Sequence, residues 1–316
     1  MLLYMFIHYF SIAFLVAASS LGAALGQGKI GKASIDALNR QPAAQSGIFN
    51  AFAVSMAIIE TSSILGLIMG FVLLRIQPTS LYESLGSFGA ACALGIPACY
   101  AGINGSYPAE TALYSIARQP FFTKKILQLM ILIQAVMQTP LIFGFISAFL
   151  IKSTISSNLP LEQALSLCAS GLCIGLGSLG AIKGIRIFSI QALQASSINK
   201  QTFPKIWSFT VLSISLIETS ALFSFLVSIA LFNKQLSTNL SLMQAYMLLG
   251  AAFLMALGTI GPAIQSGNTS AAAVKVLPFK PECYNDLFRT SLFGQVLIDS
   301  IAIYALLIAL LLVAWS

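Results

Sequence analysis

Eight long apolar segments constrain this chain more than any other feature of its sequence. A helix needs about 20 predominantly apolar residues to cross a bilayer. Segments of that kind run at residues 2–28, 46–74, 85–105, 126–151, 161–182, 206–233, 240–264 and 287–315. Because no backbone group can stay unpaired in lipid, these segments are predicted to be helices rather than strands. We therefore expect an all-α, polytopic membrane protein with eight transmembrane helices.

The composition excludes most other classes of protein. Charged residues make up 8% of the 316 residues, whereas a soluble domain carries roughly 25%. This low charge argues against a disordered chain, a nucleic-acid binder and a soluble enzyme of ordinary composition. A single His and five scattered Cys offer too few ligands for a His/Cys metal site. We expect no catalytic residue and no cofactor.

The basic residues indicate how the helices are oriented. All Lys and Arg except Arg75, Lys152 and Lys234 lie in or beside four alternate connections, near residues 29–45, 106–125, 183–205 and 265–286. By the positive-inside rule these four connections face the cytoplasm. Both termini are then expected on the non-cytoplasmic side, and the eight segments group into four pairs.

Three acidic residues lie in the middle of spans. Glu60, Glu218 and Asp299 each occupy the second helix of a pair, whereas the other acids lie near span ends or in the basic connections. An ionisable group at that depth costs at least about 2.5–3.5 kcal/mol on insertion scales. A protonated or paired carboxyl that serves packing would explain one such acid. Three acids at the same place in a repeat favour a functional role.

The chain repeats one hairpin four times. The sequence Ile-Glu-Thr-Ser occurs at 59–62 and again at 217–220, and Ile-Asp-Ser at 298–300 occupies the same place in the last repeat. In the second repeat, Ala-Arg-Gln-Pro at 117–120 corresponds to Asn-Arg-Gln-Pro at 39–42, which puts Gln138 in the position of the acid. Positions 60, 138, 218 and 299 thus recur about every 80 residues. We expect four hairpin units at residues 1–76, 77–153, 154–236 and 237–316.

Glycine is concentrated in the first helix of each predicted pair. Gly22 and Gly26 lie in the first of these helices, and Gly171, Gly180 and Gly184 lie in the third. Small residues at near four-residue spacing let membrane helices approach closely. We expect the first helices to form a tightly packed inner layer, and the bulkier second helices to form an outer layer that carries the acids.

The repeated hairpin resembles the c-type proteolipid of F-type rotary ATP synthases. The shared features are a Gly-rich helix, an Arg-Gln-Pro loop and a second helix with a mid-membrane carboxyl. The resemblance covers essentially the whole chain, as four fused hairpins of the F/V-type proteolipid family. Its most specific parts are the spacing from Arg40 to Glu60 and the Gly-Gln-Gly at 26–28. Rotary V-type ATPases also use fused hairpins, but Arg-Gln-Pro favours the F-type.

The resemblance implies a non-catalytic component of a rotor ring, which translocates H⁺, or Na⁺ in some members, during ATP synthesis or hydrolysis. The implied partners are other copies of the chain in a ring, the ATP synthase a subunit, the central stalk and membrane lipid, with no nucleic acid. The implied location is a membrane crossed several times, for which we expect the bacterial inner membrane.

The family's ion sites carry over residue by residue. The resemblance implies an ion-binding set made of Glu60, Glu218, Asp299, Gln27, Thr61, Thr219, Ser300 and Tyr304. Gln27, Glu60 and Thr61 match the sodium-binding pattern, so Na⁺ is an option at Glu60, whereas the incomplete sets elsewhere leave H⁺ as the default. Sites in such rings form between neighbouring hairpins, so Thr139 or Ser300 would complete the site of an adjacent acid.

The second hairpin is expected to carry no ion. Gln138 cannot ionise, so Gln138 and Thr139 form a degenerate site, and each chain would transport at most three ions per four hairpins. The family's loops contact the central stalk, which implies this role for Arg40, Gln41, Pro42, Arg118, Gln119 and Pro120. Ile198 and Phe279 replace the loop Arg in the third and fourth hairpins.

Two other interpretations stay open. A self-contained eight-helix ion channel or carrier would have inverted repeats or broken helices. The repeats here run in the same direction and show no mid-span break, with Pro97 and Pro140 as the nearest candidates for kinks. A non-transporting structural paralogue within a mixed ring is the other interpretation.

Overall fold

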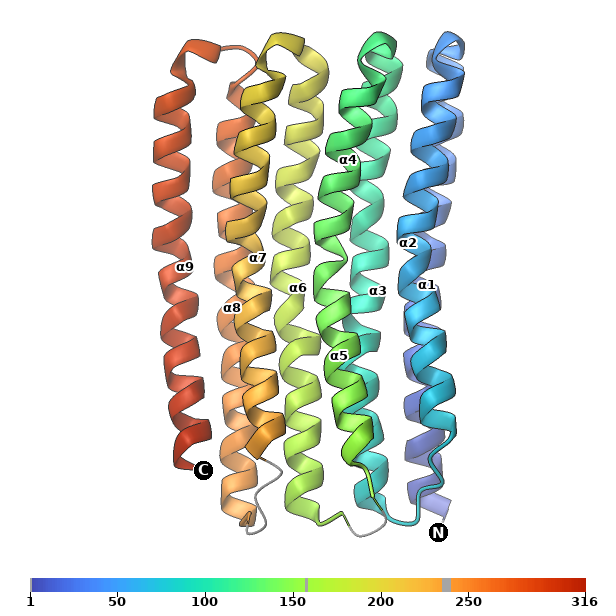
Figure 1. Cartoon of the computed structure of the whole chain (residues 1–316), viewed down its shortest axis with the longest axis vertical. Coiled ribbons are helices and arrows are strands. Elements are labelled where there is room, and N and C mark those ends of the chain that lie inside the picture. The colour runs from blue at the N-terminus through green and yellow to red at the C-terminus, as the bar shows by residue number, and fades with distance from the viewer. Residues whose placement is uncertain (1, 157–158, 235–239) are drawn as a thin grey trace.

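The computed structural model describes residues 2–156, 159–234 and 240–316, and every regular element in these residues is helical. The spans are α1 (Leu2–Arg40), α2 (Gln45–Leu74), α3 (Leu81–Arg118), α4 (Thr123–Met137) with α5 (Thr139–Thr154), α6 (Leu161–Ile198), α7 (Phe203–Lys234), α8 (Leu242–Val276) and α9 (Tyr284–Trp315) (Figure 1). Eight spans are long and apolar enough to cross a membrane, with α4 and α5 forming one of them. This confirms the predicted fold class. The expected unit boundary between residues 236 and 237 lies outside the described residues.

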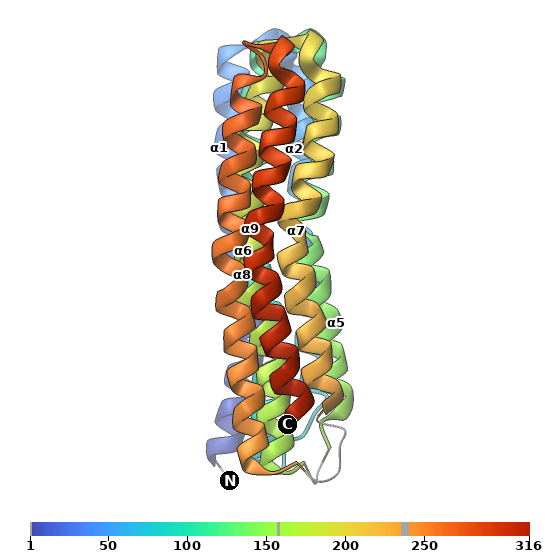
Figure 2. The same ribbon diagram turned by 90° about the vertical axis from the view of Figure 1, so that its left-hand side faces the viewer.

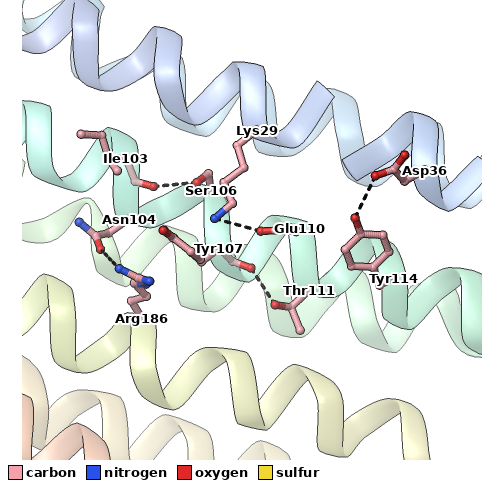
Figure 3. A network of polar contacts seen from close by, with 10 residues as sticks. All are labelled: Lys29, Asp36, Ile103, Asn104, Ser106, Tyr107, Glu110, Thr111, Tyr114 and Arg186. Carbon is pink, nitrogen blue, oxygen red and sulfur yellow. Dashed lines mark hydrogen bonds and ion pairs between the residues drawn. The ribbon is translucent and has the colours of Figure 1, made fainter. Parts of the chain in front are cut away.

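The helices extend further than the apolar segments. Short turns of 3-10 helix join the paired helices at Pro42–Ala44 (η1), Pro120–Phe122 (η2), Lys200–Thr202 (η3) and Pro281–Cys283 (η4). The expectation that residues 29–45 and their three counterparts are connections is therefore wrong, because most of these residues continue the first helix of the pair. Polar contacts between neighbouring helices support the extra turns, as where Lys29 Nζ lies 3.1 Å from the Glu110 carboxylate (Figure 3).

The two Arg-Gln-Pro loops turn in the same way. Gln41 has φ and ψ of −145° and 80°, and Gln119 has −134° and 75°. The residue before a proline prefers this extended region because the proline ring crowds its backbone. Pro42 and Pro120 then begin the 3-10 turns, where a missing N–H leaves no helical hydrogen bond unmade.

The helices form two layers. The glycine-rich helices α1, α3, α6 and α8 pack side by side in that order, and α2, α4–α5, α7 and α9 lie along them as the second layer (Figures 1 and 2). The N and C termini lie at one end of the molecule, and the 3-10 turns lie at the other end. Gly171 of α6 packs directly on the backbone of Gly89 of α3, where a Cβ would have no room. This confirms the expected tight inner layer.

The outer helix of the second hairpin is interrupted at Gln138. Pro140 supplies no N–H, so the i→i−4 ladder cannot pass this point unchanged. The N–H of Gln138 bonds to Ala135 O at 3.1 Å, and the N–H of Leu141 bonds to Gln138 O at 3.1 Å, both with the shorter three-residue spacing. Pro97 lies within the continuous helix α3. The expectation that the repeats have no mid-span break is thus wrong at Gln138.

Candidate functional site

The three mid-span acids differ in how far the neighbouring hairpin covers them. Glu60 on α2 is exposed, Glu218 on α7 is half-buried, and the Asp299 side chain on α9 is 8% exposed. Glu60 belongs to the first hairpin of the row, which has no neighbour on the side of α1 away from α3. The exposure of Glu60 therefore reflects its place in the row rather than a different repeat position.

Two of the acids pair with a hydroxyl from the preceding hairpin. The Thr139 hydroxyl, at the start of α5, lies close enough to the Glu218 carboxyl to act on it as a hydrogen-bond donor. Thr219, on α7, has its Oγ1 3.5 Å from Asp299 Oδ2. The second oxygen of Asp299, Oδ1, is buried and has no hydrogen-bond partner among the described residues. The same contact thus recurs at two successive junctions, each time with the hydroxyl that directly follows the acid position.

The remaining hydroxyl and tyrosine candidates make no hydrogen bond to an acid within the described chain. The Thr61 hydroxyl donates to Ile58 O at 2.7 Å, and the Ser300 hydroxyl donates to Leu297 O at 2.7 Å. Such bonds to the preceding turn are what hydroxyls in helices commonly make. The Tyr304 side chain is 63% exposed on the outer helix α9, and no hydrogen bond joins it to Asp299 in the part of the chain that the structure describes.

A glutamine joins the inner and outer helices near three of the four repeat positions. In the first hairpin, Gln27 Nε2 donates to Met56 O at 3.4 Å rather than to Glu60. In the second, Gln134 Nε2 donates to Gly105 O at 3.0 Å. In the fourth, Gln295 Oε1 accepts from the Ser266 hydroxyl at 3.3 Å. Gly105 and Ser266 occupy the repeat position of Gln27, so the amide has moved from one helix to the other.

Sequence reasoning missed Gln134 and Gln295. Both lie four residues before the acid position on the outer helix, which places them one turn away on the same face. That spacing is visible in the sequence, and it is the signal that would have found them. The third hairpin has Ile214 at this place and Ile185 at the inner position, so it contains no such amide.

Gln138 occupies the acid position of the second hairpin, and its amide is buried inside the protein. The side chain is 7% exposed, and neither its Nε2 nor its Oε1 has a hydrogen-bond partner in the described residues. The Nε2 lies near Gly105 on α3, 3.8 Å from where a Cβ of that glycine would stand. An uncharged amide can be held at this depth, whereas it can neither bind nor release a proton at ordinary pH.

The loop candidates lie together at the end of the molecule opposite the termini. The Arg40 guanidinium lies 4.7 Å from the centre of the Tyr114 ring, and Arg118 donates to the Ser197 hydroxyl at 3.3 Å. Both guanidinium groups therefore make their contact with the next hairpin. Gln41, Pro42, Gln119 and Pro120 form the turns and remain at least partly exposed.

The sequence model of one protein family matches the chain three times. Residues 10–73, 88–151 and 249–312 match the family of the ATP synthase C subunit, and together they make up more than half of the chain. The chain belongs to the ATP synthase C-subunit family. The three matches fall in the first, second and fourth hairpins. The third hairpin, α6 with α7, has the same arrangement in the structure and keeps an acid at Glu218.

Three known ATP synthase subunits are similar in sequence to parts of this chain. The ATP synthase c subunit 2 of Cereibacter sphaeroides is 45% identical over 65 residues, which are 21% of this chain and 78% of that one. The A-type ATP synthase K subunit of Methanocaldococcus jannaschii is 31% identical over 230 residues, which are 72% of this chain and 94% of that one. The ATP synthase c subunit 1 of Pelobacter propionicus is 39% identical over 62 residues, 20% of this chain and 68% of its own. Family membership and eight spans make this a multi-pass membrane protein.

Proposed function

We propose that this chain builds the rotor ring of an F-type ATP synthase and carries H⁺ on Glu60, Glu218 and Asp299. One observation carries the proposal. At two successive junctions, a carboxyl in mid-span meets a hydroxyl of the preceding hairpin, as Glu218 meets Thr139 and Asp299 meets Thr219. A packing role would not require the same acid and hydroxyl at repeated junctions.

The chemistry of a carboxyl suits this task. Facing lipid, the carboxyl is stable only in its neutral form, because an isolated charge in the hydrocarbon is costly. Beside a polar channel and a fixed cation, the ionised form becomes favourable and the proton leaves. The arginine of the ATP synthase a subunit, which the family resemblance implies, would supply that cation. Rotation of the ring then carries the proton from one side of the membrane to the other.

Protons suit the described ligands better than sodium ions. The Asp299 carboxyl meets one hydroxyl oxygen, and its Oδ1 has no partner among the described residues. A cation such as Na⁺ needs several oxygen ligands, whereas one proton needs a single acceptor. Glu60, with Gln27 and Thr61 nearby in the repeat, is the position at which Na⁺ would have most ligands.

The proposal includes the number of ions and the orientation. Gln138 carries nothing, so four hairpins move three protons, and the ratio of protons to ATP is lower than in a ring with an acid in every hairpin. The 3-10 turns face the cytoplasm, where Arg40, Gln41, Pro42, Arg118, Gln119 and Pro120 contact the central stalk, and both termini face the other side. The positive-inside rule and the two Arg-Gln-Pro turns support this orientation.

The break at Gln138 is the feature that most favours a self-contained carrier. Carriers with broken helices use paired breaks in repeats of opposite direction, and their binding site lies at those breaks. Here the break occurs in the second hairpin, at the position where the acid is absent. The break therefore fits a hairpin released from ion binding better than it fits a transport path.

Vesicles containing the purified complex test the proposal. ATP is expected to acidify the vesicle interior in the absence of Na⁺, and a carboxyl-specific carbodiimide is expected to stop this acidification. A chain that purifies without an ATP-hydrolysing head, and that moves ions without ATP, would support the carrier instead.

A further inference from the structure

The loop end of the second hairpin carries a pair of exposed lysines that the other hairpins do not repeat. Lys124 and Lys125 lie in the first turn of α4, directly after the turn η2. The corresponding pairs are Ser46 and Gly47 in the first hairpin, Pro204 and Lys205 in the third, and Asn285 and Asp286 in the fourth. The Lys205 ammonium already donates to Pro281 O at 2.8 Å. Of the four hairpins, only the second therefore presents two cations at this place.

Two cavities on the outer layer lie on either side of α4 at this end (Figure 1). The first, of about 440 Å³, lies between the starts of α2 and α4 and is lined by η1, η2 and Ser46, Gly47, Asn50, Thr123, Lys124 and Lys125. The second, of about 360 Å³, lies between α4 and α7 and is lined by Lys125, Gln128, Phe203, Pro204, Trp207 and Ser208. We call them the α2–α4 groove and the α4–α7 groove. Lys125 lines both, and both lie between hairpins of the same chain.

Both grooves lie where the outer helices enter the apolar part of the membrane. The apolar segment of the second outer helix begins at residue 126, directly after Lys125. Trp207 lines the α4–α7 groove, and tryptophan side chains gather at the level of the lipid headgroups. Exposed apolar side chains follow on the neighbouring helices, with Phe49 on α2 and Val211 on α7. A lipid headgroup in the grooves would therefore have its acyl chains beside apolar helix surface.

The protein itself does not compensate the charge of the two lysines. No acidic side chain of the described residues lines either groove. The ion pair within the described chain joins Lys29 to Glu110, on the inner layer. The Ser46 hydroxyl and the Asn50 amide line the α2–α4 groove and make no side-chain hydrogen bond in the part of the chain that the structure describes. Uncompensated positive charge beside hydrogen-bond donors favours a phosphate group as the ligand.

We propose that the two grooves hold one anionic phospholipid, with its phosphate between Lys124 and Lys125 and its acyl chains along α4. Basic pockets between membrane helices at the cytoplasmic side bind headgroups of this kind. The choice of the cytoplasmic leaflet rests on the orientation in the proposed function, whereas the binding itself does not depend on a ring. Each chain has one such site, at the hairpin whose acid position is occupied by Gln138.

The bound lipid supports the interrupted outer helix. α4 ends at Met137, and the backbone passes to α5 through the shorter hydrogen bonds at Gln138. The other three outer helices, α2, α7 and α9, are continuous. A lipid in both grooves contacts α2, α4 and α7 together, so it holds the loop half of the broken helix against its two neighbours in the outer layer.

Native mass spectrometry of the purified full-length chain tests the chemistry of the site. One phosphatidylglycerol per chain is expected to stay bound under conditions that remove phosphatidylcholine, and Lys124→Gln with Lys125→Gln should weaken this binding at least about tenfold. The matched control is Lys200→Gln with Lys205→Gln, which removes the same charge from the third hairpin, outside both grooves. Equal loss in the two double variants, or displacement of the lipid by inorganic phosphate, would overturn the proposed occupant.

Tryptophan fluorescence tests the position of the lipid. Trp315 lies at the opposite end of the molecule, so Trp315→Phe leaves Trp207 as the only reporter of the two tryptophans. In vesicles, phosphatidylglycerol with brominated acyl chains should quench Trp207 more than brominated phosphatidylcholine does, and Lys124→Gln with Lys125→Gln should remove this difference. Equal quenching by the two lipids, or a difference that survives in the double variant, contradicts the site. Neither measurement involves ATP-driven transport, so such a result leaves the proposed function standing.

Discussion

The Thr219 hydroxyl lies 3.5 Å from the Asp299 carboxylate in the next hairpin and 2.6 Å from Leu216 O in its own helix. A hydroxyl has one proton and two lone pairs, so it cannot donate to both acceptors at once. While the Thr219 hydroxyl donates its proton to Leu216 O in a hydrogen bond, its oxygen can accept a hydrogen bond from a neutral Asp299. The same oxygen can turn its proton to an ionised carboxylate, so this contact serves both states of a proton carrier.

Asp299→Asn is expected to stop proton transport while leaving the ring assembled. Asn is close in shape to Asp but cannot ionise, so the fourth hairpin could neither bind nor release a proton beside the a subunit. ATP-driven acidification of vesicles, together with native mass spectrometry of the oligomer, measures both effects. The matched control is Asp286→Asn on the same helix, since Asp286 is exposed near the loop end of α9. Undiminished acidification by Asp299→Asn would remove this residue from the transport path.

Gln138→Glu is expected to give the second hairpin a titratable site. The Gln138 amide makes no hydrogen bond within the described chain, so a protonated carboxyl of the same length loses no bond there. The number of carbodiimide-modified carboxyls per chain, measured by intact mass, should rise by one. If the variant is folded and its new carboxyl stays unmodified, the break at Pro140 has removed the position from access as well as from ionisation.

Gly171→Ala is expected to destabilise the chain by about 1–3 kcal/mol, because its Cβ would overlap the backbone of Gly89 and force the helices apart. Gly31→Ala is the matched control, since nothing lies within 4 Å of that Cβ position and Ala109 occupies the same place in the second hairpin. The control should gain up to about 1 kcal/mol from the higher helix propensity of Ala. Thermal unfolding in detergent measures both changes, and equal effects would contradict the close packing.

Pro140→Ala is expected to join α4 and α5 into one continuous helix. The restored N–H can bond to Val136 O, so amide hydrogen exchange around residues 138–141 should slow by on the order of tenfold, or about 1.4 kcal/mol of local opening. Pro97→Ala serves as the control, because Pro97 already lies within a continuous helix. Unchanged exchange after Pro140→Ala would mean that packing around Gln138, rather than the proline, causes the break.

The sequence alone predicts the eight spans, their pairing and the glycine-rich inner layer, because these follow from hydropathy and residue size. It does not predict that α1 continues to Arg40, since the turns beyond the apolar segment depend on partners such as Glu110 in the next hairpin. Pro140 is visible as a candidate kink, but the interruption at Gln138 appears only once the backbone is built.

The candidate sites are likewise predicted in part by the sequence and in part only by the structure. The positions of Glu60, Glu218 and Asp299 follow from the repeat, whereas the contacts of Glu218 and Asp299 with a hydroxyl of the preceding hairpin depend on how hairpins pack. Tyr304 matches a family pattern in sequence, yet its side chain is exposed on α9 and makes no hydrogen bond to Asp299 among the described residues. The role of Gln134 and Gln295 becomes clear only from their hydrogen bonds to Gly105 and Ser266 on the inner helices.

Carbodiimide labelling of the intact ring, followed by mass spectrometry of each hairpin's peptides, tests the central claim most directly. The account predicts labels on Glu60, Glu218 and Asp299, three per chain, at neutral pH and without protection by Na⁺. Labels confined to acids near the membrane surfaces, such as Glu83 and Glu162, would contradict a role for the mid-span carboxyls in carrying protons.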